Sequence, residues 1–524
     1  MSVYGQTITP VRSLKNSSIT VDPRRILAPV DERIYSGFVE HLGRCIYGGL
    51  VDYNKTPKTK VNGKRHREDV SKAIKDLKMP VVRWPGGNFV SSYHWIDGVG
   101  ARENRPRRPE LAWLGEESNQ FGTDEFIEWC HEMKVEPYFC LNMGTGTLDE
   151  ALGWIEYCNS TANTYYANLR RKNGHPAPYN VKYWGLGNEV WGDWQVGQMT
   201  KEDYAKKAAE WAKAIKLLDP NVQLISCGCT GLDNWDHHVL DKLINWVDMH
   251  SIHMYTAHDE YIKNVTAPAA AETAIQVTKN LIDLATIQHP PKANGVNSLE
   301  ADSKKKVKIC FDEWNIWDPT RADGTKGAEE KYTLSDALAI ASWLNVFIRQ
   351  SESLGMCNIA QLVNVIAPIM TNDSTVFLQT TYWPLMLFSN YMRDGHALDL
   401  HVETKMYTGA TGINDGSYKW IQGKFGVTLL DVSAVKKIGS DTIYIAIVNR
   451  SEDEEANTKI DFHTKISGIH AWELYHDDVL ASNSFETPDK VVLKENDCQI
   501  IQNEDKSVNF TFQKHSFTLL EVKY

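Results

Sequence analysis

The sequence predicts an α/β fold in which a (β/α)8 TIM barrel is joined to an all-β sandwich. Strand patterns alternate with helices at 37–42, 81–84, 137–142, 181–186, 223–227, 248–254, 308–311 and 358–365. The helical patterns, with apolar residues three or four apart, include 68–78, 123–133, 202–218 and 334–350. Eight successive βα units predict a closed parallel barrel. An open doubly wound sheet is the alternative, but no Gly-x-Gly-x-x-Gly follows the first strand.

The sandwich is predicted because the helical patterns stop near residue 395. Short strand patterns with polar turns follow, at 442–449, 471–475, 490–493, 508–512 and 517–522. Two N-terminal segments, 6–9 and 18–21, also alternate with period two, and an isolated hairpin would be marginally stable. We therefore expect residues 1–27 to join 395–524 in one discontinuous domain, with the barrel at 28–394. The segment 290–306 is rich in Pro, Asn, Ser and Lys and predicts a surface insertion.

The composition excludes several classes of protein. A net charge of −11 argues against a nucleic-acid surface, which needs a basic face. No apolar run is long enough for a membrane span, and the first residues lack a signal-peptide core. The nine scattered cysteines have neither zinc-site nor disulfide spacing and favour a reducing compartment. A cytoplasmic location is expected, with secretion as the alternative if a leader precedes the given sequence.

Two predicted strands end at a glutamate in apolar and aromatic surroundings. Glu189 closes the stretch VKYWGLGNE, and Glu313 lies in VKICFDEWN. Catalytic groups of a barrel gather at the carboxyl ends of its strands, so both should face one mouth. Taken singly, such a glutamate is usually solvated or ion-paired. Burial would raise the pKa of one, as a general acid requires, while Arg83 could keep the other ionised.

Paired carboxylates at one mouth fit glycoside hydrolysis. One protonates the leaving oxygen, while the other attacks the anomeric carbon or activates water. A separation of roughly 5–5.5 Å implies retention of configuration, and roughly 6.5–9.5 Å implies inversion. Every predicted strand except the fifth also carries polar groups suited to a sugar at its end: Glu40, His41, Arg83, Asn88, Asn142, His253, Tyr255, Gln361 and Asn364.

Four motifs in order resemble glycoside hydrolase family 51, whose members are chiefly α-L-arabinofuranosidases. They are RWPGGN at 83–88, WGLGNE at 184–189, FDEWN at 311–315 and AQLVNVIAP at 360–368. The resemblance covers nearly the whole chain, from FVEHLG at 38–43 to the predicted sandwich. It implies an exo-acting retaining enzyme that releases arabinofuranose from arabinan, arabinoxylan or their oligosaccharides, without cofactor or metal. It also suggests a homo-oligomer, often a hexamer.

The resemblance implies residue roles as well. Glu189 would be the general acid/base and Glu313 the nucleophile, with Arg83 in support. The substrate-binding residues that it implies are Glu40, Asn88, Trp113, Asn188, His253, Tyr255, Trp317 and Gln361. Asn188 suits the sugar 2-hydroxyl, whose hydrogen bond strengthens in the transition state. Trp113 and Trp317 would wall the pocket, with a place in the core as the alternative, and His253 could instead orient a neighbour.

Some features leave alternatives open. The chain departs from the pattern of many bacterial members at 190–194 (VWGDW) and 256–258 (TAH), which border the leaving-group side. A family member that cleaves β-xylosidic or β-glucan bonds is therefore one alternative, and a non-catalytic carbohydrate-binding protein on the same barrel is another. The stretch GTGT at 144–147 resembles a phosphate loop only superficially, because no Gly-Lys-Ser/Thr follows.

Overall fold

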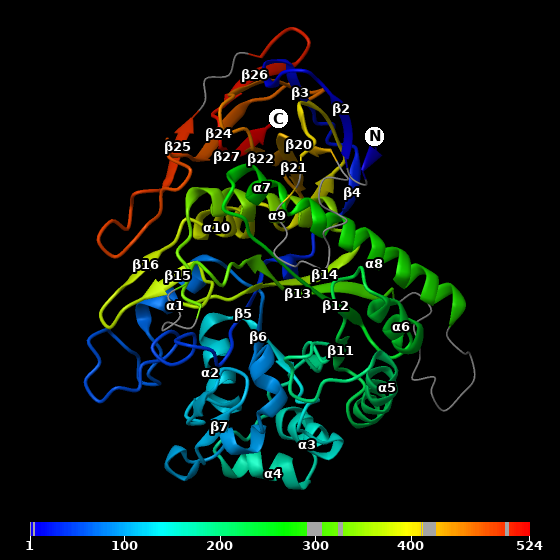
Figure 1. Ribbon diagram of the computed structural model, residues 1–524, viewed down its shortest axis with the longest axis vertical. Coiled ribbons are helices and arrows are strands. Elements are labelled where there is room, and N and C mark those ends of the chain that lie inside the picture. Colours follow the sequence, from blue (N-terminus) through cyan, green and yellow to red (C-terminus); the bar gives the residue numbers. More distant parts are fainter. Residues whose placement is uncertain are drawn as a thin grey trace.

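The computed structural model describes residues 2–3, 6–290, 306–322, 328–409, 411, 426–497 and 502–524. Eight parallel strands close into a barrel in the order of the chain (Figure 1). They are β5 (Ser36–Phe38), β6 (Val81–Trp84), β9 (Glu136–Cys140), β10 (Tyr183–Leu186), β11 (Gln223–Ser226), β12 (Met249–Thr256), β13 (Lys308–Ile316) and β14 (Leu354–Ala360). This closed barrel, with further β-sheets beside it, confirms the predicted fold class.

The last two barrel strands differ from their predicted bounds. β13 continues to Ile316 through a register shift between Phe311 and Trp314, so Glu313 lies within the strand. β14 ends at Ala360, whereas the apolar pattern predicted a strand to residue 365. Apolar residues continue past the strand because the following loop is buried too, which places Gln361 directly after the strand.

Helices cover the outside of the barrel. They are α1 (Glu68–Asp76), α2 (Thr123–Met133), α3 (Leu148–Asn159), α4 (Tyr165–Lys172), α5 (Lys201–Leu218), α6 (Asn234–Leu243), α7 (Tyr261–Thr266), α8 (Ala269–Gln288), α9 (Leu334–Arg349) and α10 (Tyr382–Tyr391). A capping box of Thr333 and Asp336 begins α9. All residues of α9 are buried, because it packs both on the barrel strand β13 and on a sheet beyond the barrel (Figure 1).

Two packed β-sheets form the second part of the molecule, with a core of their own. One sheet contains β1 (Ser2–Val3), β2 (Gln6–Pro10), β18 (Leu400–Thr404), β3 (Ser17–Thr20), β23 (Ala456–Asp461) and β26 (Ser507–Phe512). The other contains β25 (Leu493–Asp497), β24 (Gly468–Leu474), β27 (Ser516–Lys523), β22 (Thr442–Asn449), β21 (Leu430–Lys437), β17 (Gly395–Leu398) and β4 (Ile26–Pro29). N-terminal strands pair with C-terminal ones in both sheets, as β2 and β3 flank β18 and β4 pairs with β17.

A buried network of charges joins the barrel to these sheets. Arg349 of α9 donates to Asp431 of β21 at 3.0 Å and to Glu272 of α8 at 2.9 Å. Arg450 approaches the other oxygen of Asp431 at 3.2 Å. Buried charges are stable when they are paired, so this network holds one helix face to one sheet in a single arrangement.

Several remaining predictions concern the periphery of the fold. The strand predicted at 490–493 begins instead at Leu493, and the strands β17, β18, β21 and β23 were not predicted. The insertion predicted at 290–306 lies, apart from its two end residues, outside the described residues. The described cysteines are free and buried. None of the helices in the described parts of the chain combines the length and apolar character that crossing a membrane requires.

Candidate active site

A cavity of about 640 Å³ opens at the carboxyl ends of the barrel strands. It brings together residues that lie far apart in the sequence, and most of the predicted site residues line it: Glu40, Asn88, Trp113, Glu189, His253, Tyr255, Glu313, Trp317 and Gln361. Arg83 and Asn188 are buried behind this wall and contact its members. His41, Asn142 and Asn364 do not line the cavity, and they hydrogen-bond instead to groups that hold the surrounding loops.

Glu313 is held by two donors, one on each carboxylate oxygen. Arg83 Nη1 donates to Oε1 at 2.7 Å, and the Tyr255 hydroxyl donates to Oε2 at 2.7 Å. Burial, with the charge of Glu313 next, raises the pKa of the Tyr255 phenol well above its ordinary value, so the phenol keeps its proton and remains a donor. The carboxylate of Glu313 is therefore fixed in direction and faces the cavity.

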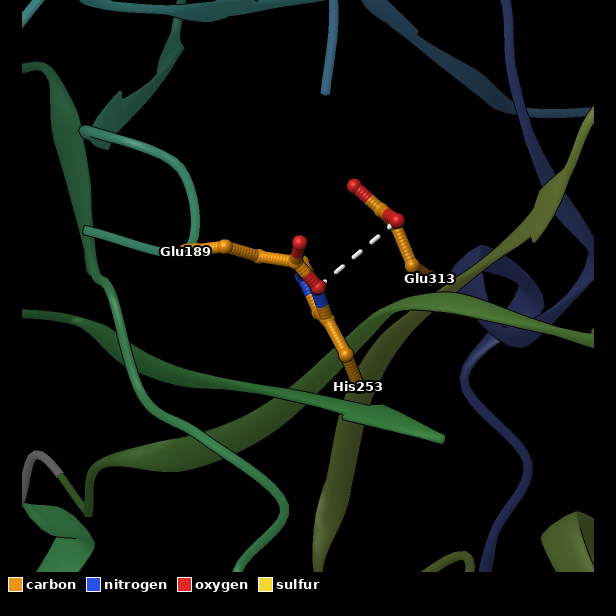
Figure 2. A group of neighbouring side chains, drawn as sticks. All are labelled: Glu189, His253 and Glu313. Carbon is orange, nitrogen blue, oxygen red and sulfur yellow. Dashed lines mark hydrogen bonds and ion pairs between the residues drawn. The ribbon is translucent and has the colours of Figure 1, made fainter. Parts of the chain in front are cut away.

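Glu189 lies in the turn after β10, three residues beyond Leu186. Its backbone φ of 43° lies in the left-handed region, which few side chains adopt, and Gly187 just before it has a φ of 83°. The turn brings the carboxylate across the cavity toward Glu313 (Figure 2). One carboxylate oxygen of Glu189 and one of Glu313 lie within 4.8 Å of each other. This close approach of two oxygens favours the roughly 5–5.5 Å carboxyl separation of retaining glycosidases over the roughly 6.5–9.5 Å of inverting ones.

His253 lies between the two glutamates. Its Nδ1 is 2.9 Å from Glu189 Oε1 and 3.7 Å from Glu313 Oε2 (Figure 2). Its Nε2 is 3.2 Å from Asp312 Oδ1. Burial alone would lower the pKa of His253, but the charge of Glu313 and the bonds to Asp312 and Glu189 outweigh it and raise the pKa to about 10. The resulting imidazolium places a positive charge beside Glu189, Asp312 and Glu313.

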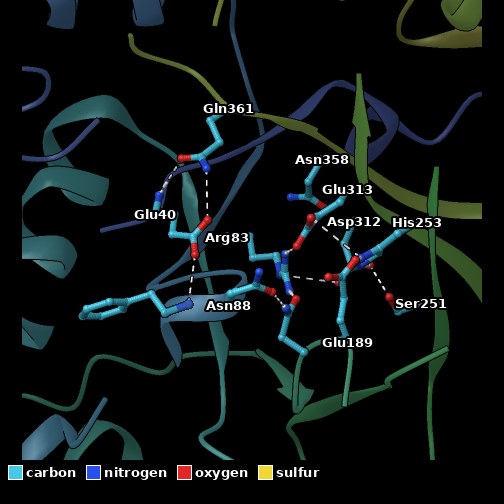
Figure 3. Close-up of polar contacts among 12 residues, drawn as sticks. Glu40, Arg83, Asn88, Glu189, Ser251, His253, Asp312, Glu313, Asn358 and Gln361 are labelled. Carbon is cyan, nitrogen blue, oxygen red and sulfur yellow. Dashed lines mark hydrogen bonds and ion pairs between the residues drawn. The ribbon is translucent and has the colours of Figure 1, made fainter. Parts of the chain in front are cut away.

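Asp312 is a fourth charged partner that the sequence reasoning did not select. It accepts hydrogen bonds from Ser251 and His253, and Arg83 Nε lies 3.5 Å from its Oδ2 (Figure 3). The Tyr138 hydroxyl also donates to Asp312 Oδ2. Burial would raise its pKa, but Arg83 and then His253 and Ser251 outweigh it and lower the pKa. Asp312 thus stays ionised and orients both cations of the site.

The trio of Glu189, His253 and Glu313 also has the spacing of a metal site. The protonated state of His253 argues against metal binding, because a histidine that binds a metal must be a neutral imidazole with a free lone pair. Both ring nitrogens of His253 face carboxylate oxygens, and its pKa is raised to about 10. These residues fit an ion-paired acid–base site rather than a metal centre.

The opposite wall of the cavity is built around Glu40. Its Oε2 accepts a hydrogen bond from Gln361 Nε2 at 3.1 Å (Figure 3). Its Oε1 accepts hydrogen bonds from the Phe89 amide at 3.0 Å and from Trp113 Nε1 at 3.2 Å. Burial, and next the charge of Glu313, raises the pKa of Glu40 to about 8. Gly87 permits this close packing, since a Cβ there would meet a Glu40 oxygen at 2.5 Å.

Asn188 and Asn88 connect the two walls. Arg83 Nη2 donates to Asn188 Oδ1 at 2.6 Å, and Asn188 Nδ2 donates to Asn88 Oδ1 at 3.3 Å. The Arg83 guanidinium therefore holds the side chain of Asn188 as well as that of Glu313 (Figure 3). Polar side chains fixed in this way are suited to bind a sugar with several hydroxyls.

Aromatic side chains line the outer part of the cavity. The rings of Trp317 and Tyr255 meet edge to face at 5.3 Å, and those of Trp191 and Trp194 do so at 5.2 Å. Trp191, Trp194 and Gln195 line the cavity but were not selected from the sequence as site residues. The sequence feature that could have indicated them is the tryptophan-rich turn directly after Glu189. A sequence pattern alone does not distinguish tryptophans that line a cavity from tryptophans in the hydrophobic core.

Comparison with known proteins identifies the family. The family model of the α-L-arabinofuranosidase 1 domain matches residues 73–272, and that of the α-L-arabinofuranosidase C-terminal domain matches 312–516. The probable α-L-arabinofuranosidase C of Aspergillus flavus is 51% identical over 99% of this chain and 99% of its own length. The thermostable family 51 α-L-arabinofuranosidase of Thermotoga petrophila has a TM-score of 0.85 at 38% identity, covering 97% of this chain and 100% of its own. This chain belongs to glycoside hydrolase family 51.

A second relative extends the comparison within family 51. The intracellular exo-α-(1→5)-L-arabinofuranosidase of Halalkalibacterium halodurans is 34% identical over 89% of this chain and 92% of its own length. Membership in family 51 confirms the resemblance seen in the four sequence motifs. In this family 51 chain, each of those motifs supplies at least one side chain to the cavity or to the residues directly behind it.

We predict that replacing His253 by Gln destabilises the fold in a pH-dependent way. The pKa of His253 is raised from 6.5 to about 10, so its stabilising effect is full below pH 6.5 and is lost as the pH rises through 10. The gap in Tm between wild type and His253→Gln should therefore narrow from neutral pH to pH 10. Thermal unfolding at constant ionic strength measures this gap. The control is His131→Gln, an exposed position on α2; a gap for His253→Gln that stays constant with pH would contradict the prediction.

Proposed function

We propose that this protein is a retaining exo-α-L-arabinofuranosidase that releases terminal arabinofuranose from arabinan, arabinoxylan or their oligosaccharides. The observation that carries the proposal is the pair Glu189 and Glu313, whose carboxylate oxygens face each other within 4.8 Å across the cavity. That spacing leaves room for a sugar carbon between the carboxylates but not for an additional water, which supports double displacement.

In the first step, Glu313 attacks the anomeric carbon and Glu189 protonates the departing glycosidic oxygen. The donors Arg83 and Tyr255 hold Glu313 in one orientation, so that little reorganisation is needed when it attacks. The bond from the anomeric carbon to the leaving oxygen breaks as the bond to the Glu313 oxygen forms. The product of this step is a glycosyl ester on Glu313 and a free alcohol.

In the second step, Glu189 takes a proton from water, and that water attacks the anomeric carbon. The ester bond to Glu313 then breaks, and arabinofuranose leaves with its original configuration. His253 supports both steps, since its imidazolium donates to Glu189 and balances the charge that returns to Glu313. Asp312 keeps His253 oriented through the other ring nitrogen.

The sugar itself would lie against the wall formed by Glu40, Gln361 and Asn88, with Asn188 at the 2-hydroxyl. A buried hydroxyl without a partner costs about 1–3 kcal/mol, so a site with many fixed polar groups selects a small sugar with matching hydroxyls. Trp113 and Trp317 would enclose its faces. The name of the H. halodurans relative, an exo-α-(1→5)-L-arabinofuranosidase, supports release from the chain end.

The domain division, assembly and location also remain proposals. We propose a barrel at 28–394 and a discontinuous β-sandwich of 1–27 and 395–524, supported by the pairing of β2 and β3 with β18.

A homo-oligomer, by family resemblance a hexamer, is proposed as the assembled form. A cytoplasmic location is supported by the name of the H. halodurans relative, which is called intracellular.

A panel of 4-nitrophenyl glycosides tests the substrate assignment. We expect release of nitrophenol from the α-L-arabinofuranoside at a kcat/KM at least about 100-fold above that for the β-D-xylopyranoside or β-D-glucopyranoside, because only the furanose matches the fixed hydroxyl partners; a factor of 100 corresponds to about 2.7 kcal/mol. Faster cleavage of the xyloside or glucoside would favour the alternative specificity. Binding without cleavage of any glycoside would favour a non-catalytic carbohydrate-binding protein.

Replacing each glutamate separately tests the two roles. Glu313→Ala should abolish turnover of every substrate, since no covalent intermediate can form. Glu189→Ala should slow deglycosylation but retain partial turnover of 4-nitrophenyl arabinofuranoside, whose leaving group needs little protonation. Added azide should accelerate Glu189→Ala, because it attacks the intermediate without a general base. Normal activity of Glu313→Ala would overturn the assignment, and equal loss on good and poor leaving groups in Glu189→Ala would overturn its role as the acid.

A further inference from the structure

Gln195 is a buried side chain in the turn that follows Glu189, and the proposed mechanism gives it no role. Its side chain lines the cavity, and the residue is only 4% exposed. Its Nε2 donates to the Asn88 backbone carbonyl at 3.4 Å and to the Ser91 hydroxyl oxygen. Both partners lie in the 3-10 helix η3 (Asn88–Ser92), which follows barrel strand β6. The side chain thus connects the turn of Glu189 to the segment that carries Asn88.

The chemistry of these partners fixes the orientation of the Gln195 amide. The Asn88 carbonyl can only accept a hydrogen bond, so Nε2 rather than Oε1 must face it. Gln195 Oε1 is then buried, and no partner for it is found among the described residues. The contacts of Nε2 therefore join the turn of Glu189 to η3.

Close backbone packing supports the same connection. A Cβ on Gly144 would lie 2.4 Å from the Ser91 carbonyl oxygen and 2.7 Å from that of Val196. Gly197, with a φ of 79°, lies so near that its own Cβ would approach Gly144 Cα at 2.4 Å. Glycines at these positions let the loops after β6, β9 and β10 touch. This packing explains the GTGT stretch, which is a contact point between loops and not a phosphate site.

We propose that Gln195 is a positioning residue that holds the turn of Glu189 against η3, and so sets the placement of Glu189 and Asn88 relative to each other. The inference rests on the proposed function of this site. In the proposed mechanism Glu189 protonates the leaving oxygen, and Asn88, which accepts a hydrogen bond from Asn188, binds the sugar. A catalytic group misplaced by about 1 Å can lose about 100-fold in rate. Loss of the Gln195 hydrogen bonds should therefore lower the rate of general-acid catalysis strongly while it lowers the stability of the fold little.

The test compares Gln195→Met with Gln198→Met on two substrates. Methionine keeps the volume of the side chain but removes the donor, and Gln198 is an exposed residue of the same turn. Methyl α-L-arabinofuranoside needs protonation of its leaving group, whereas the 4-nitrophenyl α-L-arabinofuranoside needs little. We expect Gln195→Met to lose about 10- to 100-fold in kcat/KM on the methyl glycoside. On the nitrophenyl glycoside the fold-loss in kcat/KM should be smaller by a factor of at least about 10. Gln198→Met should match the wild type on both.

A second variant approaches the same contact from the other loop. Ser91→Ala removes one of the two acceptors of Gln195 Nε2 and leaves the sequence of the turn unchanged. It should show the same leaving-group-dependent loss, and the double variant with Gln195→Met should lose less than the product of the two single losses. Ser91→Ala also serves as the test if Gln195→Met does not fold.

Each outcome decides between separate claims. If the wild type hydrolyses neither glycoside, the proposed function fails. If the wild type is active but Gln195→Met and Ser91→Ala match Gln198→Met on both substrates, only the role of Gln195 is overturned. Equal losses on the two substrates, accompanied by a lower Tm, would show that Gln195 stabilises the fold without positioning the acid, and would also overturn the proposal.

Discussion

The buried guanidinium of Arg83 is the constraint on which the rest of the site depends. It donates to Glu313 and to Asn188, approaches Asp312 at 3.5 Å, and lies over the ring of Phe38 at 4.7 Å. Asp312 and Glu313 are adjacent buried carboxylates, and a buried charge is costly unless a cation lies beside it. Arg83 contacts Glu313 and approaches Asp312, and His253 contacts Asp312 from the other side. Arg83 and His253 together lower the pKa of Asp312, which therefore stays ionised.

The barrel supplies the geometry that makes this arrangement reachable. Arg83 lies on β6, Glu313 on β13, His253 on β12, and Glu189 just beyond β10. Because these strands are parallel, their carboxyl ends meet at one mouth although up to 230 residues separate Arg83 from Glu313. The left-handed backbone at Glu189 and the glycines at 87, 144 and 197 then bring the loops into contact. The buried network of Arg349 and Asp431 acts elsewhere and fixes the sheets to the helix layer.

The sequence predicted the parts of the protein that follow local patterns. β6 was predicted with its exact residues because VVRW is bounded by Pro80 and Pro85, and Glu189 and Glu313 stood out as polar ends of apolar runs. The bounds of β14 were wrong because its apolar run continues into a buried loop. β17, β18 and β23 were missed because short strands among polar turns carry a weak periodic signal. β21 was missed although it spans eight residues. Asp312 and Gln195 were missed because their roles arise from partners distant in sequence, such as Tyr138 and Ser91.

The close approach of Glu189 and Glu313 makes retention of configuration the central claim, and the anomer of the first product tests it most directly. Proton NMR during the first minutes of hydrolysis of 4-nitrophenyl α-L-arabinofuranoside shows which anomer forms before mutarotation mixes them. If Glu313 is the nucleophile, α-L-arabinofuranose forms first, and methyl α-L-arabinofuranoside forms when methanol is the acceptor. Initial formation of the β anomer would show single displacement by water and would contradict the assignment of Glu313 as the nucleophile.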